Sequence, residues 1–237
     1  MKYLYAMIAA ACLVGCASVA PSHYYQLRYT SQAKSSHAPY PYSVVMRTLD
    51  APDVYSRTNI VYRASEYEVA FYSDYLWADK PARLVGNAFF DHLERENLFR
   101  EFSRTAGDAV PDYELGGELR EIEEVLADSG NKASARLVLI YTLKKFDTQK
   151  VLWSQKFESE EQMPARSPDA FLRCESEMLR DINGRAVQAL DSVFSAMPQG
   201  QSDEDRRTFH SGMPAATAAP ENQNIPAPSD SGLQTAP

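Results

Sequence analysis

Cysteine is scarce in this chain, which has only three among its 237 residues. Cys12 and Cys16 both fall in an apolar stretch at the N-terminus, so Cys174 is the remaining thiol of the main body. An intramolecular disulfide is therefore excluded within that body. Cys174 lies on an apolar stripe of helical spacing, and we interpret it as a small buried hydrophobic residue; pairing between chains is the alternative.

Positive charge is also in deficit, because 24 Lys and Arg residues face 32 Asp and Glu residues and leave a net charge of −8. A protein that binds nucleic acid needs a basic surface to neutralise phosphates. An anionic lipid surface makes the same demand. We therefore expect no nucleic-acid partner and no electrostatic binding to acidic lipid.

Motifs for catalysis and metal binding are missing. The histidines are scattered and form no H-x-x-x-H pattern: His23, His37, His92 and His210. There is no nucleophile elbow, P-loop or dinucleotide-binding motif, and Gly116-Gly117 fits close packing or a bulge in a strand better than a phosphate site. The carboxylates Glu118, Glu121, Glu123 and Glu124 are most simply a solvated strand face. We expect no enzyme activity, no metal and no cofactor.

The longest apolar run lies at the N-terminus, from Tyr3 to Val14. Spanning a bilayer takes about 20 residues, so this run has the length of a secretory signal instead. It closes on Leu13-Val14-Gly15-Cys16, which resembles the bacterial lipobox. We therefore predict a signal peptide at residues 1–15 and lipidation of Cys16. Cys12, which follows three alanines, is a second candidate, and an ordinary signal peptide is the alternative.

Lipidation of Cys16 would also set the location of the protein. One acyl chain binds a membrane only weakly, whereas the several chains of a lipoprotein cysteine, palmitate among them, anchor it stably. In the bacterial sorting rule, which applies here by resemblance, Asp after the cysteine retains a lipoprotein at the inner membrane. Ala17 stands there instead, so we expect the periplasmic leaflet of an outer membrane. Residues 16–23 then form a short tether of about 25 Å at most.

The rest of the chain divides into one domain and a tail. Residues 24–197 are enough for a single domain with a substantial core. Residues 198–237 consist largely of Pro, Ala, Ser, Gln and Asn. Because this composition cannot bury enough apolar surface to order itself, we predict a disordered tail.

Alternating apolar residues predict strands on both sides of a central helix. In Ala133–Phe146, Leu139 and Tyr141 share one face, and the other face is half polar. Tyr113–Ala127 changes phase near Glu121, which indicates a bulge or a bend. The other expected strands are Tyr24–Tyr29, Tyr42–Leu49, Asn59–Arg63, Tyr67–Tyr72 and one from Val151 to about Glu160.

Two amphipathic helices are expected. The first runs from Pro81 to about Leu98 with Asp79 as its cap, and Phe99 to Asp112 follows as a connector. The second runs from Pro168 to about Met197, with Gly184 at a kink or a close contact. Together these elements predict an α/β (α+β) fold with a single mixed, largely antiparallel sheet and both helices on one face.

Aromatic residues are concentrated between positions 24 and 77. Tyr and Trp are common at protein-binding and amphiphile-facing surfaces, but they also fill small β-rich cores. We select Tyr55, Tyr75 and Trp77 as candidate partner-binding residues, with core packing as the alternative. Exposure decides between the two, because a buried Trp77 would serve only the fold.

Three short motifs behind the lipobox resemble those of a known family. They are Tyr25-Gln26-Leu27, Ala51-Pro52-x-x-Tyr55-x-Arg57-x-x-Ile60-Val61-x-Arg63 and Tyr75-Leu76-Trp77-Ala78-Asp79-x-Pro81. Their order resembles the ABC-type transport auxiliary lipoprotein family, which includes the paraquat-inducible protein C branch, over roughly residues 24–197. One departure is Tyr55-Ser56, where the family more often has Tyr-Leu-Asp before the Arg.

The resemblance implies partners rather than a reaction. Members of the family accompany an inner-membrane ABC transporter and an MCE-domain protein that moves lipids or other hydrophobic molecules between membranes. The implied fold is similar to the N-terminal domain of TolB. We therefore expect a docking component at the outer-membrane end of such a route, and a homo-oligomer is left open. The alternative is a stand-alone periplasmic envelope-integrity lipoprotein, either structural or a cryptic hydrolase.

Overall fold

The structure, a computed structural model, describes residues 21–31, 35, 37–107, 109–127 and 132–197. Within them the strands are β1 (His23–Tyr25), β2 (Tyr40–Met46), β3 (Asn59–Arg63), β4 (Val69–Trp77), β5 (Phe99–Ser103), β6 (Tyr113–Leu126), β7 (Ala133–Lys145) and β8 (Val151–Gln162). The helices are α2 (Pro81–Glu96), α3 (Pro168–Ser195) and the short 3-10 helix η2 (Asp53–Tyr55). The predicted signal peptide, most of the tether and the tail lie outside the described residues.

Strand β6 is the centre of the sheet, because it pairs with three other strands: β2, β3 and β7. One edge runs antiparallel to β7 along its whole length. The other edge is shared by two shorter parallel strands, β2 beside residues 113–115 and β3 beside residues 123–125. Strand β5 adds to β2, β4 and β1 add to β3, and β8 adds to β7. The predicted mixed, largely antiparallel sheet is confirmed, since its long pairings are antiparallel.

The predicted irregularity of β6 lies where its second edge changes partner. The register with β7 shifts between Leu119 and Glu121. An extra residue bends a strand and increases its twist. The bend separates two ends of the sheet. We call the part built from β1, β4 and β3 the N-terminal end, and the part built from β2 and β5 the distal end.

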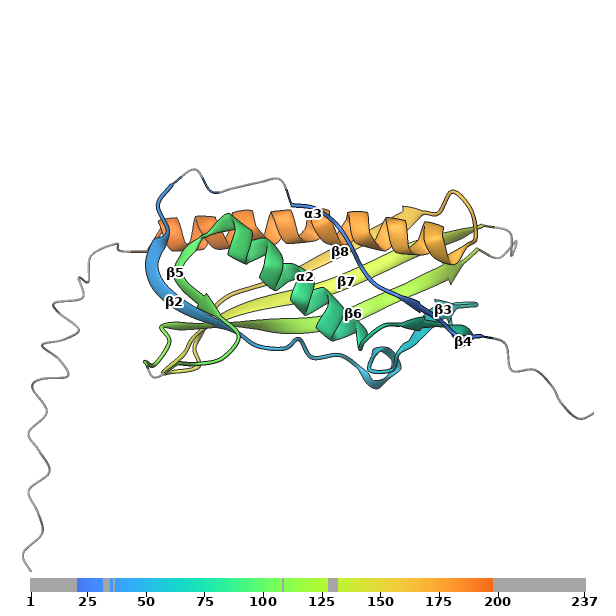
Figure 1. Cartoon of the computed structure of the whole chain (residues 1–237), viewed down its shortest axis with the longest axis horizontal. Helices are drawn as coiled ribbons and strands as arrows, with labels where there is room; N and C mark the ends of the chain where they lie inside the picture. The colour runs from blue at the N-terminus through green and yellow to red at the C-terminus, as the bar shows by residue number, and fades with distance from the viewer. Residues whose placement is uncertain (1–20, 32–34, 36, 108, 128–131, 198–237) are drawn as a thin grey trace, which may run out of the picture. The chain divides into compact units, whose positions relative to one another are not determined.

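Both helices cover the same face of the sheet, as predicted (Figure 1). Helix α3 packs on β7 and β8, and α2 packs on β6 and on α3. Phe89 of α2 stacks on Tyr141 of β7 with ring centroids 4.1 Å apart. The core therefore lies between the helices and one face of the long strands.

Helix α3 begins as predicted, whereas α2 is capped differently. Ser167 precedes Pro168 and its side chain accepts a hydrogen bond from the backbone N–H of Ala170. The residue before α2 is Lys80, which supplies no side-chain cap. Asp79 instead accepts a hydrogen bond from the Lys80 N–H at 2.7 Å, so the prediction that Asp79 caps the helix is wrong.

Two strand predictions were wrong for tertiary reasons. The first strand ends at Tyr25 because the chain then leaves the sheet and crosses the helices, where the Arg28 N–H donates to Ser176 Oγ of α3 at 3.2 Å. The segment Phe99–Ser103 was predicted as a connector but forms β5, parallel to β2. The residue pattern of Phe99–Ser103 does not predict a strand; the segment becomes one because β2, distant in sequence, supplies its hydrogen-bond partners.

Candidate interaction surfaces

Large apolar side chains that stay exposed gather at the two ends of the sheet. At the N-terminal end, Tyr67 (89% exposed) and Phe71 (37%) form what we call the N-terminal rim, whereas Tyr24 (67%) lies on β1 opposite Leu76, about 23 Å of strand from Val69. At the distal end they are Val110 (73%) and Val151 (51%), which we call the distal rim. Val110 precedes β6 and Val151 opens β8 beside the end of β7, so the two rims lie at opposite ends of the long strands.

A chain of half-buried tyrosines lies beside the N-terminal rim. Tyr62 and Tyr72 have ring centroids 4.7 Å apart, and Tyr72 and Tyr75 follow at 5.2 Å. Tyr25 meets Tyr75 edge to face at 6.1 Å. Some aromatic rings of this region therefore pack on one another and others reach the surface. Core packing and surface exposure, the two interpretations of the aromatic-rich sequence, both apply.

The predicted partner-binding residues lie at different depths. Trp77 is 1% exposed and packs against Phe171 of α3, with ring centroids 6.0 Å apart. Tyr55 is 3% exposed. Tyr75 is half-buried at the sheet edge formed by β1 and β4. The core alternative therefore describes Trp77 and Tyr55, and only Tyr75 offers part of its ring to a partner.

The carboxylates of β6 do not form a uniformly solvated face, which corrects the sequence interpretation. Glu123 is fully buried and accepts hydrogen bonds from the Tyr55 hydroxyl at 2.7 Å and from Arg63 Nε at 2.6 Å. Glu124 is also buried and forms an ion pair with Arg166 at 3.1 Å. Burial, followed by the Glu123 carboxylate, raises the pKa of Tyr55, which stays protonated as the donor. These contacts hold the fold together.

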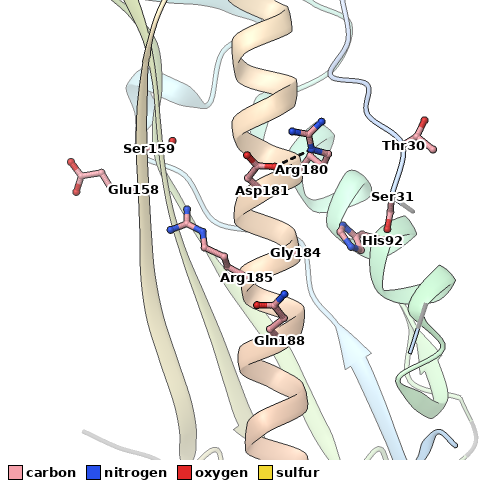
Figure 2. Close-up of a pocket in the computed structure, with 10 residues that line it drawn as sticks. All are labelled: Thr30, Ser31, His92, Glu158, Ser159, Arg180, Asp181, Gly184, Arg185 and Gln188. Atoms are coloured by element: carbon pink, nitrogen blue, oxygen red, sulfur yellow. Dashed lines mark hydrogen bonds and ion pairs between the residues drawn. The ribbon is translucent and has the colours of Figure 1, made fainter. Parts of the chain in front are cut away.

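An open groove of about 840 Å³ runs over the middle of α3, between β8 on one side and α2 on the other (Figure 2). Its lining residues are Thr30, Ser31, His92, Glu158, Ser159, Arg180, Asp181, Gly184, Arg185 and Gln188. A Cβ atom added at Gly184 would meet nothing within 4 Å, and α3 continues through this residue. The predicted close contact at Gly184 is therefore wrong, and the missing side chain leaves the groove open.

A buried hydrogen-bond network ties the crossing segment 26–31 to both helices beside this groove. Tyr141 donates to Asn183 Oδ1 at 2.8 Å, and Asn183 Nδ2 donates to the Tyr29 hydroxyl at 2.7 Å. The Tyr29 hydroxyl donates to the backbone carbonyl of Ala88 at 3.0 Å and lies 3.2 Å from His92 Nδ1. Burial lowers the pKa of His92, so this imidazole stays neutral. The contact of His92 with the Tyr29 hydroxyl helps to hold the crossing segment against α2.

Charges of both signs line the groove. Arg180 donates to Asp181 at 2.9 Å, and the Arg185 guanidinium lies 5.6 Å from the centre of the Phe157 ring. A pocket for an apolar ligand is lined mainly by apolar side chains with few polar groups. The groove therefore suits a polar segment or a hydrated ligand better than an acyl chain.

The described part of the chain offers neither a membrane-spanning helix nor a metal-binding cluster. None of its helices is both long and apolar enough to span a bilayer. Its His, Cys, Asp and Glu side chains form no group of three that could hold a metal ion. The lipobox, Cys16 and Ala17 lie outside the described residues.

Solved structures show the same fold. A crystal structure of a Xanthomonas campestris protein of the DUF330 family is 15% identical, with a TM-score of 0.63 over 72% of this chain and 96% of that one. A second crystal structure, of an uncharacterised protein, is 11% identical with a TM-score of 0.57 and covers 72% of this chain and 99% of that one. At these identities the likeness extends to the fold alone. No curated protein matches the chain.

A family model identifies the chain at the sequence level. The model describes an ABC-type transport auxiliary lipoprotein component and matches residues 25–186. The match begins inside β1 and ends within α3, so it spans the sheet and both helices. The sequence resemblance is thereby confirmed, and this chain belongs to the ABC-type transport auxiliary lipoprotein component family.

Proposed function

We propose that the chain is an outer-membrane-anchored periplasmic lipoprotein, without enzymatic activity, that docks an MCE-type ABC transport system. The observation that carries the proposal is the family match over residues 25–186 behind a lipobox that ends at Cys16. Lipidation at Cys16 would hold the domain on a membrane, and membership of the family supports a partner in a transport system. The cargo of such a system is a lipid or another hydrophobic molecule.

The distal rim is our candidate contact for the MCE-domain partner. Val110 and Val151 expose apolar surface at the distal end of the sheet. The tether enters at β1, which is far from this end. The fully buried core of a protein–protein interface is more apolar than the rest of a protein surface, so a partner can cover such side chains. The mixed charge of the groove over α3 does not suit acyl chains, which favours docking over carriage of the lipid by this subunit.

Crosslinked pull-down from membranes tests this proposal with the full-length protein. We expect the MCE-domain protein of the same cell to be recovered with the unaltered chain. The double substitution Val110→Asp and Val151→Asp places charge in the contact and should lower that recovery about tenfold, equivalent to about 1.4 kcal/mol. Gln155→Asp adds the same charge to an exposed site in the middle of β8 and serves as the matched control.

The outcomes separate the alternatives. Unchanged melting temperatures of all variants would show that any loss of recovery reflects binding. Equal recovery with the double variant and the Gln155→Asp control would place the contact elsewhere. Recovery of envelope-assembly factors or peptidoglycan without any transporter component would favour the stand-alone envelope-integrity lipoprotein.

A further inference from the structure

The chain that leads to the predicted anchor runs toward the N-terminal rim. Strand β1 is parallel to β4, with His23 opposite Tyr75. Followed backwards from His23, the chain therefore heads along β4 toward Val69, where the β3–β4 hairpin turns. Tyr67 lies in that turn and is 89% exposed. The hairpin and the entry of the chain thus occupy the same end of the sheet (Figure 1).

The tether is long enough for the anchor at Cys16 to lie next to the β3–β4 hairpin. Six residues separate Tyr75 from Val69, which corresponds to about 20 Å of strand at most. Seven residues separate Cys16 from His23 and reach about 25 Å at most. Strand β6, by contrast, spans about 45 Å between the two ends of the sheet at the usual rise per residue. An anchor at Cys16 therefore holds the N-terminal end nearest to the leaflet.

The side chains at this end suit the headgroup layer of a bilayer. Tyrosine rings concentrate at membrane–water interfaces, because one end of the ring is apolar and the hydroxyl is hydrated. Tyr67, in the β3–β4 turn, presents such a ring. The Arg57 guanidinium lies 5.1 Å from the centre of the exposed Phe71 ring, which brings a phosphate-binding cation next to an apolar face.

Local charge indicates which lipid surface fits. Glu66 and Glu68 flank Tyr67 in the hairpin and are exposed. Arg57 lies over Phe71, three residues beyond Glu68, and adds a positive charge on the same hairpin. A zwitterionic headgroup, with its phosphate and its ammonium group, can satisfy both signs, whereas an anionic lipid would be repelled by the two carboxylates.

We propose that the N-terminal rim rests in the zwitterionic headgroup layer of the leaflet that holds the anchor, and that it orients the distal rim away from the membrane. The inference depends on the lipid anchor in the proposed function. It assigns a membrane contact to the protein surface itself, beyond the anchor. The β3–β4 hairpin then acts as a foot that fixes the angle of the domain.

Depth-dependent fluorescence quenching tests the contact with the full-length lipidated protein. A fluorophore is attached at Glu66→Cys in the hairpin or, as the far-end control, at Lys150→Cys beside β8, both exposed sites. Cys174 is buried, and burial raises the pKa of its thiol, so it should not compete for the label. The protein is reconstituted into phosphatidylethanolamine–phosphatidylcholine vesicles that contain lipids with nitroxide headgroups.

We expect severalfold stronger quenching at position 66 than at position 150. Tyr67→Ser should reduce the quenching at position 66, and so should replacement of half the lipid by phosphatidylglycerol. Flotation of the vesicles reports the anchor separately, with Cys16→Ala as the unanchored control. Floating protein with equal quenching at both positions would overturn the rim contact alone. Failure of the unaltered protein to float would overturn the anchor, and the rim contact with it.

Discussion

Trp77 and Glu175 are among the buried residues of the described chain whose side-chain polar atoms have no hydrogen-bond partner. The buried Trp77 Nε1 and both carboxylate oxygens of Glu175 have no hydrogen-bond partner in the described part of the chain. For Trp77, burial of its large apolar ring next to Phe171 offsets the cost of the unpaired N–H. Glu175 has no such compensation, because a buried carboxyl group without partners loses its hydration.

Trp77→Ala is expected to lower the free energy of unfolding by about 3–5 kcal/mol, the usual cost of removing a large aromatic side chain from a core. The matched control is Trp153→Ala, which makes the same truncation at a half-buried site on β8 and should cost clearly less. Urea unfolding followed by circular dichroism measures both. Equal losses would mean that Trp77 is not a principal core residue.

Glu175 predicts a specific pH dependence. Burial, followed by the charge of Glu123, raises its pKa well above the ordinary 4.5. The folded chain therefore holds this proton more tightly than the unfolded chain, and the stabilising contribution is complete below pH 4.5 and is lost as the pH rises from there toward the folded pKa. Glu175→Gln should raise the urea midpoint at pH 8 and flatten its decline between pH 5 and pH 8.

Glu177→Gln is the control for that experiment, since Glu177 lies two residues along the same helix and is exposed. It should leave the pH profile of the unaltered protein in place. A profile for Glu175→Gln that parallels the unaltered protein would show that Glu175 does not titrate in this range.

Gly117 and Gly184 differ in how much space surrounds them, because one lies in a paired strand and the other in a helix. Gly117 of β6 has φ +155°, and a Cβ atom there would lie 2.0 Å from the backbone carbonyl oxygen of Ile140 on β7. Such a contact forces the backbones of the two longest paired strands apart. Gly184, within α3, borders open space. The strand therefore requires its glycine and the helix does not.

Substitution by alanine should act in opposite directions at these two sites. Gly117→Ala should lower the melting temperature strongly, because a backbone oxygen cannot move aside without breaking the β6–β7 pairing. Gly184→Ala should raise the free energy of unfolding by about 0.5–1 kcal/mol, since glycine costs that much in a helix interior. Calorimetry measures both, and a stabilised Gly117→Ala protein would contradict the close approach.

The two ends of the domain expose different kinds of side chain. The tether enters beside β4, near the aromatic N-terminal rim. The aliphatic distal rim lies at the opposite end of the sheet, where β7 ends and β8 begins. A membrane interface favours tyrosine, and a protein partner can cover aliphatic side chains. This polarity links the two proposals, because a domain that stands on one rim presents the other to the periplasm.

The sequence alone determined the elements whose signals are local. The two-residue alternation of β7, the phase change of β6 and the Ser167–Pro168 start of α3 each depend on residues close in sequence, so no partner was needed to predict them. The lipobox at residues 13–16 is equally local, and it remains a prediction. The family motifs also stand in the sequence, which explains why the fold class could be inferred from them.

Only the tertiary structure decided the rest, because burial and pairing are set by segments far apart in the chain. Strand β5 exists through its parallel pairing with β2. Glu123 is buried because Tyr55 and Arg63 come from elsewhere to satisfy it, although its own neighbours in sequence are typical of a solvated face. Trp77 became a core residue for the same reason: a helix that begins about ninety positions later covers it.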